Sequence, residues 1–191
     1  MSFRNDQVSE LETEKIAEIA RGQVSVPGDF VELGCYKGDT SLLLAEILKQ
    51  TGKKLWIYDS FEGLPEKSES DLSPAGVDFK GGELFVTKRE VKERFLRSGL
   101  PVPVIKKAWF KDLKETDLPE EIAFAFLDGD FYESIKESLD LIEKKISDKT
   151  VVVVHDYNNT ALPGVAKAVD EWLQGRELKT VVYQSMLIIN K

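Results

Sequence analysis

A strand, a turn containing two glycines and a helix follow one another without interruption near the start of this chain. Residues 30–33 form an apolar run typical of a buried strand, and residues 40–48 have the length and composition of a helix. A second apolar segment, residues 54–59, comes after Thr51-Gly52, which stops the helix. This order predicts a right-handed crossover between parallel strands, in a sheet covered by helices on both faces.

The rest of the chain continues the alternation of strands and helices. Before the first strand, residues 9–24 show the periodicity of an amphipathic helix, and Ser9 and Glu12 can form a capping box at its start. After the second strand we expect, in order, a helix over 88–97, strands over 102–107 and 122–127, a helix over 132–145, a strand over 150–154, a helix over 165–173 and a strand over 179–189. The pattern predicts a doubly wound α/β fold.

The size and composition of the chain are those of one globular domain. It has 191 residues, of which 42% are hydrophobic and 31% charged, so we expect a single domain over residues 1–191 with residues 1–27 as a helical lead-in. Residues 62–82 are polar and rich in Gly, Pro and Ser, and they are long for a connection. Such loops usually serve a function, which predicts a lid or substrate loop here.

Composition also excludes several classes of protein. The one cysteine, Cys35, rules out an internal disulfide and a multi-cysteine metal site. A formal net charge of −8 repels phosphate backbones, so nucleic acid is not an expected substrate. The chain has no apolar run of about 18 residues, and its first residues lack the apolar region of a signal peptide. We therefore expect a cytoplasmic protein without membrane contact.

The turn after the first strand has features of a ligand-binding loop. Glu32 ends the strand, and Gly34 and Gly38 complete an ExGxxxG pattern in front of the helix, whose free N–H groups can meet a carboxylate. Asp59 ends the second strand, where doubly wound folds place an acid against ribose hydroxyls. An adenosine group lying across the strand ends would use both features; the alternative is a tight turn with no ligand.

Polar residues also follow two later strands. Asp128 and Asp130 come after strand 122–127, and His155 and Asp156 come after strand 150–154. If these strands are neighbours, Asp128, His155 and Asp156 converge. Carboxylates with one imidazole suit Mg²⁺, and also Mn²⁺ or Fe²⁺.

Each of these residues also has a plainer interpretation. Asp128, Asp130 and Asp156 could cap the helices that follow them, and His155 could be a buried histidine bonded to a neighbour, instead of a metal ligand or general base. After strand 102–107, Trp109 and Phe110 could stack on an adenine or fill core space.

Five segments together resemble a known family. VELGCYKGDTS (residues 31–41), IYDSFEGLP (57–65), FLDGDFYES (126–134), HDYNN (155–159) and KAVDEW (167–172) resemble the macrocin O-methyltransferase family of antibiotic-sugar methyltransferases, over roughly residues 28–172. The first segment is also similar to the nucleotide loop of catechol O-methyltransferase. The resemblance implies the Rossmann-like class I methyltransferase fold, with a mostly parallel seven-stranded sheet whose last strand is antiparallel, and O-methylation of a small-molecule hydroxyl with S-adenosylmethionine.

The resemblance further implies roles for particular residues. Asp128 and His155 would be catalytic, and Asp128, His155 and Asp156 would hold a divalent metal such as Mg²⁺. Asp59 would hold the ribose, and Trp109 and Phe110 would flank the adenine. In full, the implied cofactor-binding residues are Glu32, Gly34, Tyr36, Gly38, Thr40, Asp59, Ser60, Trp109, Phe110 and Asp128.

Three departures from the family pattern leave alternatives open. His155 stands where the family usually has Asp, which puts the metal in question; Ala108 stands where Gly is expected; and the chain is shorter at its N-terminus. One alternative is a nicotinamide-dependent oxidoreductase, which the absence of GxGxxG disfavours, and another is a non-catalytic module that binds an adenosyl ligand. The methyl acceptor is not readable from the sequence, and a homodimer is one alternative for the assembly.

Overall fold

A seven-stranded sheet forms the middle layer of the protein in this computed structural model, which describes residues 7–73, 76 and 79–190. The strands lie in the order β3-β2-β1-β4-β5-β7-β6. Strands β1 to β5 are parallel, and β7 runs antiparallel to both β5 and β6. Their bounds are β1 Asp29–Leu33, β2 Leu55–Asp59, β3 Val104–Lys107, β4 Ile122–Leu127, β5 Ile146–Val154, β6 Lys179–Tyr183 and β7 Met186–Asn190.

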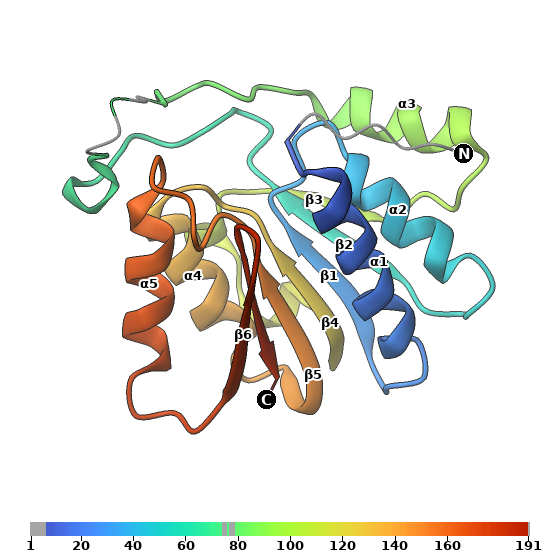
Figure 1. Cartoon of the computed structure of the whole chain (residues 1–191). Coiled ribbons are helices and arrows are strands. Elements are labelled where there is room, and N and C mark those ends of the chain that lie inside the picture. The colour runs from blue at the N-terminus through green and yellow to red at the C-terminus, as the bar shows by residue number, and fades with distance from the viewer. Residues whose placement is uncertain (1–6, 74–75, 77–78, 191) are drawn as a thin grey trace.

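Helices cover both faces of this sheet (Figure 1). Helices α1 (Glu10–Gln23), α2 (Asp39–Leu48) and α3 (Lys88–Ser98) pack on one face, and α4 (Tyr132–Ile142) and α5 (Pro163–Leu173) pack on the other. Successive strand side chains point to opposite faces, so Phe30 joins the first core and Val31 the second. Short 3-10 helices lie at Glu69–Asp71, Phe110–Asp112 and Glu115–Asp117. The predicted α/β fold is confirmed, with β7 as the antiparallel last strand.

The predicted capping box is also present. Ser9 Oγ accepts a hydrogen bond from the N–H of Glu12 at 3.3 Å, and Glu12 Oε2 accepts one from the N–H of Ser9 at 3.1 Å. Two N–H donors at the start of α1 are thereby satisfied.

The predicted single strand over 179–189 is wrong. The segment is a hairpin of β6 and β7, which turns at Gln184 with a positive φ of 54°. The turn consists of Gln184 and Ser185 and contains no Gly or Pro to mark it. Smaller differences have local causes: β3 begins at Val104 because Pro103 has no N–H to donate, and α5 begins at Pro163, a residue type favoured in the first helical turn.

The strand order reverses direction between β1 and β4. From β1 the chain adds β2 and β3 on one side, then returns to place β4 on the other side. In open α/β sheets the crevice at the carboxyl ends of the strands at this point is where ligands bind. Within the described residues, no helix combines the length and apolar character needed to span a membrane.

Candidate functional site

A cavity of about 580 Å³ lies at the carboxyl ends of the central strands. Its lining includes most of the residues singled out in the sequence: Glu32, Gly34, Tyr36, Thr40, Asp59, Ser60, Trp109, Phe110, Asp128, His155 and Asp156. Gly38 does not line it; this residue begins α2 in a left-handed conformation. Four lining residues other than glycine, Tyr36, Leu84, Asp130 and Asp156, also have positive φ, and such backbone strain is concentrated at functional sites.

Gly34 brings the ends of β1 and β4 together. Its φ is +87°, and a side chain there would collide with the backbone carbonyl oxygen of Asp128. The N–H of Asp128 in turn donates to the carbonyl of Leu33 at 2.9 Å. The glycine is therefore required for Asp128 to lie beside the loop.

Asp59 organises the same loop from β2. Its Oδ2 accepts hydrogen bonds from the N–H groups of Cys35 at 2.8 Å and Tyr36 at 3.3 Å, and its Oδ1 accepts one from Phe61 at 2.7 Å. Two carboxylate oxygens have about four acceptor positions, so capacity remains for a ligand. The neighbouring Ser60 hydroxyl donates to the carbonyl of Gly63 at 3.1 Å and stays within the turn.

Glu32 is buried beneath the loop. Ser41 of α2 donates to its Oε2, whereas its Oε1 has no hydrogen-bond partner among the described residues. Burial, reinforced by the charges of Asp128 and Asp59, raises the pKa of Glu32 to about 8. An unpartnered buried oxygen at the cavity is a position where a ligand donor would be favoured.

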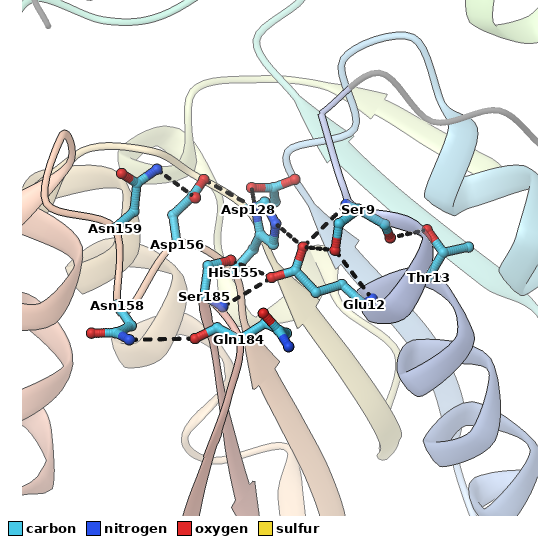
Figure 2. Close-up of polar contacts among 10 residues, drawn as sticks. All are labelled: Ser9, Glu12, Thr13, Asp128, His155, Asp156, Asn158, Asn159, Gln184 and Ser185. Carbon is cyan, nitrogen blue, oxygen red and sulfur yellow. Dashed lines mark hydrogen bonds and ion pairs between the residues drawn. The ribbon is translucent and has the colours of Figure 1, made fainter.

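The acidic residues and the histidine converge as expected. Strands β4 and β5 pair with Leu127 opposite Val154, so the residues that follow them lie side by side. His155 Nδ1 lies 3.0 Å from Asp128 Oδ1 and 3.0 Å from Asp156 Oδ2 (Figure 2). One ligand atom from each of these three residues lies within 4.8 Å of the others. Burial alone would lower the pKa of His155, but the carboxylates of Asp128, Asp156 and Glu12 raise it well above its usual value.

Glu12 is a member of this cluster that the sequence analysis assigned only to helix capping. Its side chain is buried, and its Oε2 lies 3.9 Å from Nε2 of His155 (Figure 2). Its Oε1 accepts hydrogen bonds from the N–H and Oγ of Ser185, in the β6–β7 turn, at 3.0 and 2.5 Å. The facing imidazole of His155 lowers the pKa of Glu12, and these hydrogen bonds lower it further, although burial acts in the opposite direction. The sequence carries no signal for this contact, because it joins three distant segments.

The capping alternative for the acidic residues is wrong for helix α4. The N–H of Tyr132, its first residue, donates to Oδ1 of Asp71 at 2.7 Å, and neither Asp128 nor Asp130 caps the helix. Helix α5 likewise begins without a side-chain cap, while Asp156 accepts a hydrogen bond from Asn159 at 2.8 Å. These acids lie at the cavity instead.

Asp71 was another residue that sequence reasoning missed. It is only 2% exposed and lies in the predicted lid, of which residues 62–73, 76 and 79–82 are described. Its Oδ2 accepts hydrogen bonds from the N–H and hydroxyl of Ser68 at 2.9 and 2.7 Å. The described loop residues Gly63, Leu64, Pro65, Glu66 and Asp71 form one wall of the cavity.

Comparisons with known proteins agree with this architecture. Residues 6–185 match the family Macrocin-O-methyltransferase (TylF). The chain is 32% identical over 141 residues to 8-demethyl-8-(2,3-dimethoxy-alpha-L-rhamnosyl)-tetracenomycin-C 4'-O-methyltransferase of Streptomyces olivaceus, covering 69% of this chain and 54% of the relative. It is 31% identical over 156 residues to demethyldecarbamoylnovobiocin O-methyltransferase of Streptomyces niveus, covering 78% of this chain and 59% of the relative.

A solved structure has the same fold. The O-methyltransferase NovP superposes with a TM-score of 0.81 at 27% sequence identity, over 94% of this chain and 78% of that chain. The aligned part spans between half and two thirds of the length of each curated relative above. Because the family match covers nearly the whole chain, this protein belongs to the macrocin O-methyltransferase (TylF) family.

Proposed function

We propose that this chain is an S-adenosylmethionine-dependent O-methyltransferase that acts on a hydroxyl group of a small molecule, such as a sugar or another natural product. The observation that carries the proposal is a single cavity that joins the glycine loop and Asp59 to the cluster of Asp128, His155 and Asp156. Two relatives are O-methyltransferases named for a rhamnosyl-bearing tetracenomycin C and for demethyldecarbamoylnovobiocin, which supports a small-molecule acceptor of this class.

The cofactor would lie between the glycine loop and the ends of β1 and β2. The cavity volume is within the range of small-molecule sites, about 300–1,000 Å³. In this proposal Asp59 accepts hydrogen bonds from the ribose, and the unpartnered Oε1 of Glu32 accepts one from the amino acid part of the cofactor. Trp109 and Phe110 flank the adenine; the remaining proposed contacts come from Gly34, Tyr36, Thr40, Ser60 and Asp128, with Gly38 starting the adjacent helix.

The cluster also fits a divalent metal. Two carboxylate oxygens lie 3.0 Å from Nδ1 of His155, close to the spacing of adjacent ligands in an octahedral site with bonds of about 2.1 Å. Asp128, His155 and Asp156 would hold Mg²⁺ or another divalent ion that accepts an imidazole ligand. When bound, such an ion lowers the pKa of a coordinated hydroxyl and orients it.

The reaction itself needs alignment and removal of one proton. The acceptor oxygen forms a bond to the methyl carbon as the carbon–sulfur bond of the sulfonium breaks, and the hydroxyl proton passes to the carboxylate of Asp128. Asp128 is suited to this role because its side chain is 21% exposed at the cavity while His155 and the β4–β5 pairing hold it in place. Holding both reactants in one cavity supplies much of the rate enhancement.

Isothermal titration tests the proposal with purified protein and S-adenosylmethionine, S-adenosylhomocysteine or NAD, each with and without Mg²⁺. We expect both adenosyl ligands to bind and NAD not to bind. Asp59→Ala should weaken binding about 5- to 30-fold, the effect of losing hydrogen bonds worth about 1–2 kcal/mol. Asp29→Ala is the control, because Asp29 bonds Lys54 and Trp56 at the opposite end of the sheet.

Other outcomes of the titration favour the alternatives. Binding of NAD alone would favour the nicotinamide-dependent oxidoreductase. Binding of the adenosyl ligands, without methylation of any compound in a broad screen of hydroxyl acceptors, would favour a non-catalytic module. A single domain over residues 1–191, a homodimer and a cytoplasmic location also stay predictions.

A further inference from the structure

The two ring nitrogens of His155 have different surroundings. The side chain is 4% exposed, so both nitrogens are shielded from water. Nδ1 faces the carboxylates of Asp128 and Asp156, each at 3.0 Å. Nε2 has no hydrogen-bond partner within the described part of the chain and faces the Oε2 atom of Glu12 at 3.9 Å (Figure 2).

The carboxylate of Glu12 is held in this position by four hydrogen bonds. Ser185 donates its N–H and hydroxyl to Oε1 at 3.0 and 2.5 Å, and Ser9 donates its N–H and hydroxyl to Oε2 at 3.1 and 2.6 Å. The donors belong to the start of α1 and to the β6–β7 turn, on two sides of the carboxylate. Glu12 therefore cannot rotate away from the ring without breaking a buried network.

Both ring nitrogens of His155 face carboxylates, so both favour a ring proton while no cation lies between Asp128 and Asp156. An N–H group at Nε2 is attracted to the anion, whereas a lone pair at Nε2 would face a negative charge in a site of low dielectric constant. A divalent ion between Asp128 and Asp156 would replace the proton on Nδ1 and bind the lone pair there, and the carboxylate of Glu12 would then hold the remaining ring proton on Nε2. Metal-ligating histidines commonly donate their other ring N–H to a carboxylate in this way.

We propose that Glu12 is a positioning residue that keeps the ring proton of His155 on Nε2 and so makes Nδ1 a ligand for a divalent metal between Asp128 and Asp156. This inference rests on the metal-assisted form of the proposed function.

The chain's single histidine makes a direct test available. In protein labelled with ¹⁵N-histidine and saturated with Mg²⁺, long-range ¹H–¹⁵N NMR spectra contain the ring signals of His155 alone. We expect a protonated Nε2 and an unprotonated Nδ1. A proton on Nδ1 in the presence of Mg²⁺, or ring signals that do not respond to Mg²⁺, would overturn the proposal without any variant.

Variants test the part played by Glu12. Glu12→Gln keeps the size of the side chain but places an amide before Nε2, so we expect an altered ring tautomer and a Mn²⁺ affinity, measured by electron paramagnetic resonance, that falls about 10- to 100-fold. Glu14→Gln makes the same chemical change at an exposed position of α1 and should leave both readouts as in the wild type. Equal Mn²⁺ affinity and equal ring signals in Glu12→Gln and wild type would contradict the inference.

Two further measurements separate the possible failures. If Glu12→Gln does not fold, Ser185→Ala removes one anchor of the carboxylate and should weaken Mn²⁺ binding by a few-fold; unchanged Mn²⁺ binding would count against the proposal. Titration with S-adenosylhomocysteine reports on the methyltransferase assignment independently. If S-adenosylhomocysteine does not bind the wild type, the proposed function is wrong. The NMR signals of the His155 ring still decide the role of Glu12 in that case.

Discussion

At the scale of single residues, the site depends on a few positions where the backbone conformation and its neighbours leave no room for another residue type. Gly34 is the clearest, because it combines a left-handed φ with direct proximity to the backbone of Asp128. Asp128 directly follows β4, and its N–H is bonded to the carbonyl of Leu33 in β1, so its carbonyl cannot move unless the pairing of these strands changes. Gly34 therefore links the glycine loop to the proposed catalytic cluster.

Gly34→Ala should destabilise the fold by more than about 2 kcal/mol, because strain at positive φ adds to a collision with backbone. Gly52→Ala is the matched control: its φ is +76°, but a side chain there meets nothing within 4 Å, so about 1 kcal/mol is expected. Urea unfolding gives both free energies. Equal losses in the two variants would show that the contact with Asp128 is unimportant.

At the scale of elements, buried carboxyl groups connect segments that are separate in the sequence. Glu32 joins β1 to Ser41 of α2, Asp71 joins the loop over residues 62–82 to α4, and Glu12 joins α1 to the β6–β7 turn. Each of them is at most 5% exposed. Such groups remain buried only when partners compensate the loss of water, so each one specifies how its elements dock.

Asp71→Ala should release the loop from the N-terminus of α4. The helix would lose both a hydrogen-bond acceptor and a favourable negative charge, at a cost of about 1–2 kcal/mol. Hydrogen exchange at Tyr132 and within the described loop residues should accelerate. Asp71→Asn keeps an acceptor and should show a smaller effect; identical exchange in Ala, Asn and wild-type proteins would refute the anchoring role.

Glu32 should make stability depend on pH. Burial above all, with the charges of Asp128 and Asp59, raises its pKa to about 8 in the folded protein, from 4.5 in the unfolded chain. Its contribution is therefore fully present below about pH 4.5 and is lost as pH rises through 8. Relative to Glu32→Gln, which cannot ionise, the wild type should lose roughly 2–4 kcal/mol over this range. Urea unfolding at several pH values measures it, and a pH-independent difference would contradict the raised pKa.

At the scale of the whole molecule, ligands that bind the folded state should raise its melting temperature. Mg²⁺ or Mn²⁺ at 100 times its dissociation constant should add about 2.7 kcal/mol to the stability of the wild type, and EDTA should remove this gain. Asp128→Asn should largely abolish the effect because it replaces a charged carboxylate ligand with a neutral amide. Asp148→Asn, an equal charge change at an exposed position, should retain it. A shift that persists in Asp128→Asn would place the metal elsewhere on this acidic protein.

The sequence alone determined those features that depend on neighbouring residues. The strand–turn–helix unit, the glycine turn after β1 and the acids after apolar strands follow from local periodicity and turn chemistry, and the structure places them as expected. The hairpin over residues 179–190 was missed for the same reason, since its turn, Gln184-Ser185, contains no Gly, Pro, Asn or Asp.

Only the tertiary structure decided which distant segments meet. The sheet order places β4 beside β5 and so brings Asp128 close to His155 and Asp156. From the sequence, this convergence was expected only if the two strands were neighbours. Glu12 reaches the site because α1 packs against the β6–β7 turn. Asp71 reaches α4 because the long loop crosses the start of that helix. Such contacts arise from the packing of whole elements, whose relative positions are not encoded in any short stretch of residues.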